Sequence, residues 1–116
     1  MPSPMPPPRP DKPPPCWCAS SPTSNALFAA QIGLVAEAVR LGGELGIGEA
    51  VLLGALPHGS AASRALSGAA GRGSVATFTE MVREFLSKDV AAVRQAAADL
   101  GADLGTMDEA IHTLKL

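Results

Sequence analysis

The sequence predicts an all-α protein, a helical bundle of about five helices that follows a disordered Pro-rich N-terminal tail. Of the 116 residues, 47% are hydrophobic and only 3% are aromatic, with no Tyr. Strands favour β-branched and aromatic side chains, so this Ala- and Leu-rich composition indicates packed helices instead. Nine of the 11 prolines lie within residues 1–15, where they prevent both helix and sheet ladder.

The composition changes near residue 23, which predicts a tail over 1–23 and a helical domain over 24–116. A Pro-rich tail is expected to be disordered or extended as polyproline II. The run Pro6–Pro10 could also bind an aromatic-lined groove of another protein, although a solvated tail is the simpler interpretation.

The first helix is expected to run from Ala26 to about Leu45, with Ser24 or Asn25 as its N-cap. Its first 16 residues are apolar on almost every side, and a helix of that kind must be covered from several directions. The rest of the chain offers few helices for this purpose. We therefore expect a partner subunit, or a domain outside these residues, to cover the first helix. Its polar side chains as far as Leu41 are Gln31, Glu37 and Arg40.

Two short helices should follow, over Glu49–Leu56 and Ala61–Leu66. Pro57 is expected to stop the first of them, and Ser60 to cap the second. The glycines of residues 68–74 predict a flexible loop.

Two capping boxes mark the starts of the last two helices. Thr77–Glu80 and Thr106–Glu109 both place a threonine three residues before a glutamate, so that each side chain can accept from the other's backbone N–H. Gly101 should end the fourth helix, and the fifth should run to about Leu114. Apolar residues at helical spacing predict the buried face of the fourth helix: 82, 85, 86, 90, 93, 97 and 100.

The charge balance argues against several partners. The net charge of −2 is unlike the basic face that nucleic acids require. No stretch of about 20 apolar residues is free of charge, so we expect no membrane span. The N-terminus lacks the basic start and apolar core of a signal peptide, which predicts a cytoplasmic protein.

Metal, nucleophile and phosphate sites are poorly supported. Cys16 and Cys18 do not have the usual two-residue zinc spacing, and His58 and His112 lie far apart, so no metal is expected. The glycine-rich run 42–48 ends a helix instead of beginning one, and cannot cradle a phosphate there. No base lies near the serines that could act as nucleophiles, which are Ser60, Ser63 and Ser67.

Lys88 and Asn25 are the candidate ligand-binding residues. At helical spacing Lys88 shares a face with Met81 and Phe85, which would place it at the edge of the apolar stripe, where it could reach into a cleft. The simpler interpretation is a surface lysine paired with Glu84. Asn25 is by default a helix cap, and otherwise an amide offered to a substrate.

Four motifs follow one another along the chain: Asn25 followed by an apolar helix, the Gly-Glu-Leu-Gly run, Leu53–Gly59, and Lys88-Asp89-Val90 with Leu-Gly-Ala-Asp-Leu-Gly downstream. In the order and spacing of these motifs, the sequence resembles the C-terminal helical domain of the 3-hydroxyisobutyrate dehydrogenase family, β-hydroxyacid dehydrogenases related to 6-phosphogluconate dehydrogenase and the imine reductases. The resemblance covers Leu27–Ile111, about three quarters of the chain.

The resemblance implies part of an NAD(P)-dependent oxidoreductase that acts on CH–OH groups, with NAD or NADP as cofactor. By resemblance Asn25 would hold the substrate, Lys88 would face the nicotinamide, and the first helix would lie between subunits of a homo-oligomer. The family's catalytic lysine position is Ser21 here, which cannot transfer the proton. The chain also lacks a Rossmann domain and its glycine loop. We therefore expect a fragment that is inactive alone, with no catalytic residue and no tight cofactor binding.

A second interpretation needs no cofactor. The chain would be a stand-alone helical interaction module, whose apolar first helix pairs with itself or with another protein.

Overall fold

The computed structural model describes the backbone of residues 17–116 and the side chains of residues 22–116. This part of the chain is all-α and contains no strand, as the composition predicts. It forms five α-helices and one short 3-10 helix: α1 (Trp17–Glu44), α2 (Glu49–Ala55), η1 (Leu56–His58), α3 (Arg64–Arg72), α4 (Val75–Asp99) and α5 (Thr106–His112).

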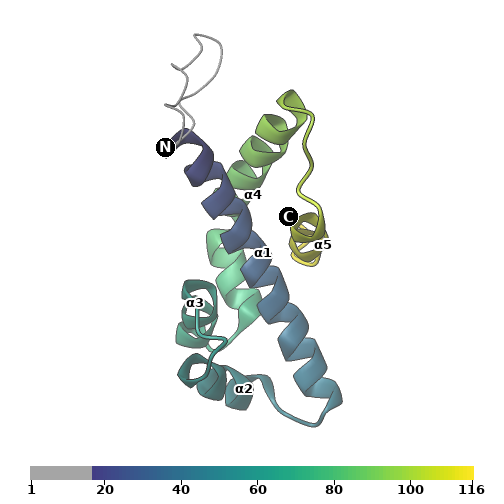
Figure 1. The fold of residues 1–116 in the computed structure, drawn as a ribbon. Coiled ribbons are helices and arrows are strands. Elements are labelled where there is room, and N and C mark those ends of the chain that lie inside the picture. Colours follow the sequence, from purple (N-terminus) through teal and green to yellow (C-terminus); the bar gives the residue numbers. More distant parts are fainter. Residues whose placement is uncertain (1–16) are drawn as a thin grey trace, which may run out of the picture.

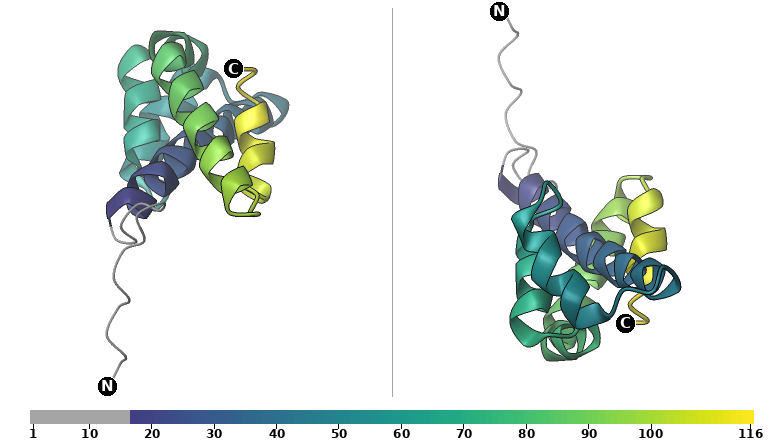
Figure 2. Two further views of the ribbon diagram at one scale, coloured as in Figure 1. Left: turned by 90° about the horizontal axis from the view of Figure 1, so that it is seen from above. Right: turned by 90° about the horizontal axis from the view of Figure 1, so that it is seen from below.

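The two long helices, α1 and α4, cross at the centre of the molecule (Figure 1). They are antiparallel: Ala26 near the start of α1 lines a groove with Val93 of α4, whereas Val39 lines a pocket with Val75 at the start of α4. The helices α2 and α3 lie on one side of this pair and α5 lies on the other (Figure 2).

The N-terminal boundary of α1 differs from the prediction. The helix begins at Trp17 and includes Pro22, so Ser24 and Asn25 lie inside it and neither is its N-cap. Pro22 is the sixth residue of this helix, where a proline removes one intrahelical hydrogen bond and crowds the carbonyl four residues before it, yet the helix continues through it. The predicted tail boundary at residue 23 therefore falls within α1. Residues 1–16, and with them the predicted disordered segment, lie outside the described part.

The C-terminus of α1 agrees with the prediction to within one residue. Gly46 has a φ of +84°. The Ile47 N–H donates to the Gly42 carbonyl at 2.8 Å and the Gly46 N–H donates to the Gly43 carbonyl at 3.1 Å. This is the pattern of a Schellman motif, which satisfies the last carbonyls of a helix. The glycine-rich run is thus a helix end, as expected.

The third helix lies further along the chain than predicted. It begins at Arg64, and the N-cap is Ser63, whose Oγ accepts from the Leu66 N–H at 3.0 Å. Residues 68–72 are helical instead of a loop. Gly68 has a packing role in this helix, because it lies directly against the Phe78 ring of α4 and a larger residue would overlap that ring.

The predicted capping boxes are wrong in detail. Ser74 caps α4, its Oγ accepting from the Thr77 N–H at 3.3 Å, so Thr77 lies inside the helix. Gly105 is the N-cap residue of α5, and Thr106 is the first residue of that helix. In both cases the true boundary precedes the threonine by one to three residues. The predicted stop of α4 is confirmed, since Gly101 has a φ of +70° just after it.

The core lies between α1, α2, α3, α4 and α5. Its largest fully buried side chains are Ile32, Leu53, Leu66, Ile111 and Val90. The helix α5 packs on α1, where Gly33 lets the two backbones approach closely: a Cβ at Gly33 would lie 2.7 Å from the carbonyl carbon of Ala110.

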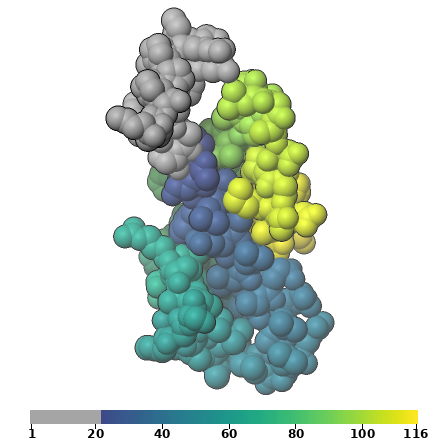
Figure 3. Space-filling model, viewed as in Figure 1, coloured from purple at the N-terminus to yellow at the C-terminus, as the bar shows by residue number. Residues whose placement is uncertain are grey.

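The side of α1 that faces away from this core is not covered within the described chain. Leu27, Leu34 and Leu41 are 48%, 58% and 49% exposed. They recur every seven residues, with Gln31 and Ala38 between them. We call these five residues the outer stripe of α1. Figure 3 looks onto α1 where it is exposed between α3 and α5.

Residues Pro22–Glu44 of α1 are long and apolar enough to cross a membrane by length and composition alone. In this fold, however, Ala29 and Ile32 are fully buried against the other helices. A core helix of a globular protein has the same composition, so this helix is weak evidence for a membrane span.

Candidate functional site

The first candidate is the outward-facing side of α4, formed by Met81, Phe85 and Lys88. The sequence correctly predicts that these residues share a face, because they are three to seven positions apart on one helix. It places that face incorrectly. The core side of α4 carries Leu86 and Val90, whereas Met81 is 51% and Phe85 72% exposed. Lys88 is exposed with them, not at the edge of the buried stripe.

No ion pair or hydrogen bond holds the Lys88 ammonium among the described residues, and in particular none joins it to Glu84. The ion pair with Glu84, on which the simpler interpretation of Lys88 depends, is therefore not formed. Met81 and Phe85 lie one turn apart on the same face, so together with Lys88 they form a small exposed apolar patch beside a cation.

Asn25 occupies the third turn of α1 and is half-buried. The cap interpretation is wrong for this residue, since the helix begins eight residues earlier. Lys88 lies in the middle of α4, and no hydrogen bond or shared pocket among the described residues joins it to Asn25. Lys88 precedes the buried Val93 by five residues, which is about 140° around the helix, so its side chain leaves α4 away from α1.

The other predicted residues do not assemble a site. Ser21 lies one turn before Asn25 within α1, and nothing is described of its side chain. Cys16 lies outside the described residues, and the Cys18 side chain does too. His58 belongs to η1 and His112 to α5, and residues 22–116 contain no group of three or more His, Cys, Asp or Glu that could hold a metal.

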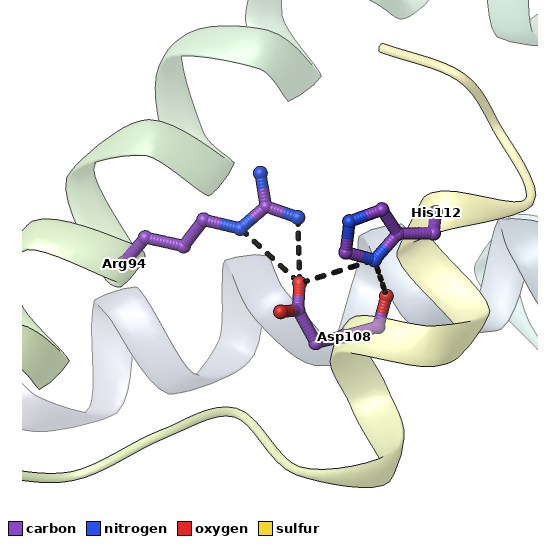
Figure 4. A network of polar contacts seen from close by, with 3 residues as sticks. All are labelled: Arg94, Asp108 and His112. Carbon is purple, nitrogen blue, oxygen red and sulfur yellow. Dashed lines mark hydrogen bonds and ion pairs between the residues drawn. The ribbon is translucent and has the colours of Figure 1, made fainter.

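A polar network between α4 and α5 escaped the sequence analysis. The Asp108 carboxylate accepts from Arg94 Nε at 3.1 Å and from Arg94 Nη2 at 2.6 Å, and the Asp108 carbonyl lies 2.7 Å from His112 Nδ1 (Figure 4). Because a carbonyl can only accept, His112 Nδ1 carries the proton. Only the pair within α5 had a sequence signal, since Asp108 and His112 are four residues apart.

This network holds α5 in place and is not arranged for catalysis. The carboxylate oxygen nearest His112 is already bound by Arg94, and it lies 3.8 Å from His112 Nδ1. A second arginine also connects the two helices, since Arg83 Nη1 donates to the Lys115 carbonyl at 2.9 Å. Long side chains therefore bridge α4 and α5, which do not pack directly on each other.

Charged groups flank the outer stripe of α1. Arg40 pairs with Glu37 at 3.0 Å and with Glu44 at 3.3 Å. The hydrogen bond that Arg40 donates to Glu37, together with the charges of both carboxylates, raises the pKa of Arg40 above its ordinary value. Arg40 is therefore charged at every physiological pH, and the flank remains polar beside the leucines.

Comparison with known proteins found no family model, no curated protein and no solved structure that matches the chain.

Proposed function

We propose that the chain is the helical domain of an NAD(P)-dependent 3-hydroxyacid dehydrogenase, and that it acts with a separate dinucleotide-binding domain. The observation that carries this proposal is the outer side of α4, where Lys88 stands unpaired beside the exposed side chains of Met81 and Phe85. A second domain closing on this side would bury Met81 and Phe85 and bring the ammonium against an anionic cofactor.

The order of the motifs supports the same proposal. Asn25 precedes the apolar part of α1, and Lys88-Asp89 lies in the middle of α4, as in the family that the sequence resembles. The described residues suit one wall of a cofactor cleft and not the whole site. They contain no strand, so they cannot form the strand–glycine-loop–helix unit that binds a pyrophosphate.

In this proposal Lys88 supplies one positive charge and Asn25 an amide for the substrate, and neither moves a proton. A nicotinamide cofactor supplies the hydride chemistry when it is bound. The family's proton-transferring lysine is replaced by Ser21, whose hydroxyl is far too weak an acid at neutral pH. The chain alone is therefore expected to be inactive. We also propose that it is cytoplasmic and that it has no affinity for nucleic acid.

The test is a titration of the isotope-labelled chain with millimolar NADH, followed by backbone amide shifts. We expect weak, saturable shifts around Met81, Phe85 and Lys88. Lys88→Gln should remove them, and the matched control Lys115→Gln, at the far end of the chain, should not. The proposal is wrong if NADH leaves this side of α4 unperturbed, or if both variants reduce binding equally.

A second function is proposed on a different observation, the outer stripe of α1. Apolar or small residues spaced alternately by four and three positions form the seam of a two-helix coiled coil. Leu27, Leu34 and Leu41 have this spacing and are about half exposed, while Gln31 between them could fix the register of a pair. In this alternative the chain is a homodimerisation module that pairs α1 with α1 of a second copy.

A further inference from the structure

A pocket of about 370 Å³ lies between α1, α4 and the end of α5. It is on the side of α4 that faces α5, away from Lys88. Small and branched apolar side chains form its walls: Ala36, Val39, Val75, Ala76 and Leu114. The volume is within the range of small-molecule sites, and the walls suit a short alkyl chain.

A side chain in the wall of the pocket carries an orphaned polar atom. Thr79 lines it and is only 5% exposed, and its Oγ1 is buried without a hydrogen-bond partner. A buried hydroxyl of this kind is unfavourable unless a hydrogen-bond partner satisfies it. Threonine in a helix can usually bond its own preceding turn, and Thr79 does not.

The remaining polar groups leave mostly acceptors free. Glu49 uses Oε2 to accept from the Val75 N–H at 3.2 Å, which leaves Oε1. Glu80 uses Oε2 to accept from Arg83 Nε at 3.1 Å, which also leaves Oε1. Arg83 has committed Nε there and Nη1 to the Lys115 carbonyl. Two carboxylates and one guanidinium give the pocket a net charge of −1.

We propose that this pocket binds a primary alkylammonium ion. An ammonium group offers three donors and no acceptor, which complements the free oxygens of Thr79, Glu49 and Glu80, and its charge balances the pocket. The short alkyl chain lies against Val39, Val75 and Leu114. An anionic ligand would meet two carboxylates, and Arg83 Nη2 would be the one cationic donor left to it.

The probe is n-butylammonium chloride, titrated into the labelled full chain at constant ionic strength and followed by amide shifts. We expect saturation in the millimolar range, with shifts confined to the pocket residues. Sodium n-butyrate, with the same chain and opposite charge, should give none. Non-saturating shifts, or equal binding of butyrate, would overturn the proposal.

Two variants locate the binding groups. Thr79→Val keeps the shape and removes the hydroxyl, and Glu49→Gln removes a charge while its amide oxygen can still accept from Val75. Each should weaken binding about fivefold to tenfold, the effect of one lost hydrogen bond. Thr77→Val, an exposed threonine of the same helix, is the control and should bind as the wild type does. Unchanged affinity in Thr79→Val would contradict this assignment.

Discussion

The contact between α1 and α5 depends on Gly33, and replacing this glycine by alanine tests it. The new Cβ would lie 2.7 Å from the carbonyl carbon of Ala110 and closer still to its oxygen. Both partners are helix backbone, so no side chain can rotate away and α5 must move as a unit. Overpacking costs about 1–3 kcal/mol, and an overlap with backbone that cannot rotate away belongs at the upper end of that range.

An alanine also favours the helix by up to about 1 kcal/mol relative to glycine. For Gly33→Ala the overlap exceeds this gain, and we expect a net loss of about 2 kcal/mol. Gly43→Ala is the matched control, because it lies in the same helix and its Cβ would meet nothing within 4 Å. In Gly43→Ala only the higher helix propensity of alanine changes the free energy of unfolding, so this variant should be more stable than the wild type.

The assay is urea unfolding followed by circular dichroism, with the free energies compared at equal slope. A loss of 2 kcal/mol corresponds to a fall in Tm of about 8–16 °C for a domain of this size. If Gly33→Ala were as stable as the wild type, the close approach of α5 to α1 would be refuted. Parallel effects of the two variants would also contradict the reasoning.

Three further changes have definite outcomes in the same unfolding assay. Ser63→Ala should cost about 1 kcal/mol through loss of the α3 cap, whereas Ser60→Ala should change stability by less than about 0.5 kcal/mol. An equal loss of stability in both variants would instead support Ser60, the predicted cap. Gly46→Ala should cost about 1 kcal/mol because its φ is +84°. Arg94→Gln should cost under about 1 kcal/mol, because the ion pair with Asp108 is partly exposed, and salt should reduce the difference.

The sequence predicts the helices well and their boundaries less well. The Ala-rich composition and the 3.6-residue period identify all five helices, and Gly46 and Gly101 end two of them as expected. Starts are harder, because Ser60 and Ser63 have the same capping chemistry and only packing selects between them. The helical Gly68 shows the same limit, since the Phe78 ring that it accommodates is ten residues away.

The candidate sites depend even more on tertiary structure. Periodicity groups Lys88 with Met81 and Phe85, but only the packed helices show that this side of α4 faces outward. The pocket beside Thr79 combines residues of α1, α4 and the end of α5 with Glu49 of α2, and no local spacing brings them together. Asp108 and Arg94 likewise meet only because α5 folds back beside α4.

Sedimentation tests most directly whether the outer stripe of α1 serves a second copy. The wild type should sediment as a dimer, and Leu34→Asp should be a monomer with unchanged helicity, because Leu34 is already 58% exposed in the single chain. The control Leu100→Asp changes a leucine that is 67% exposed on another surface, and it should remain dimeric. A wild type that stays monomeric at every concentration would contradict pairing through α1, and so would a Leu34→Asp variant that still dimerises.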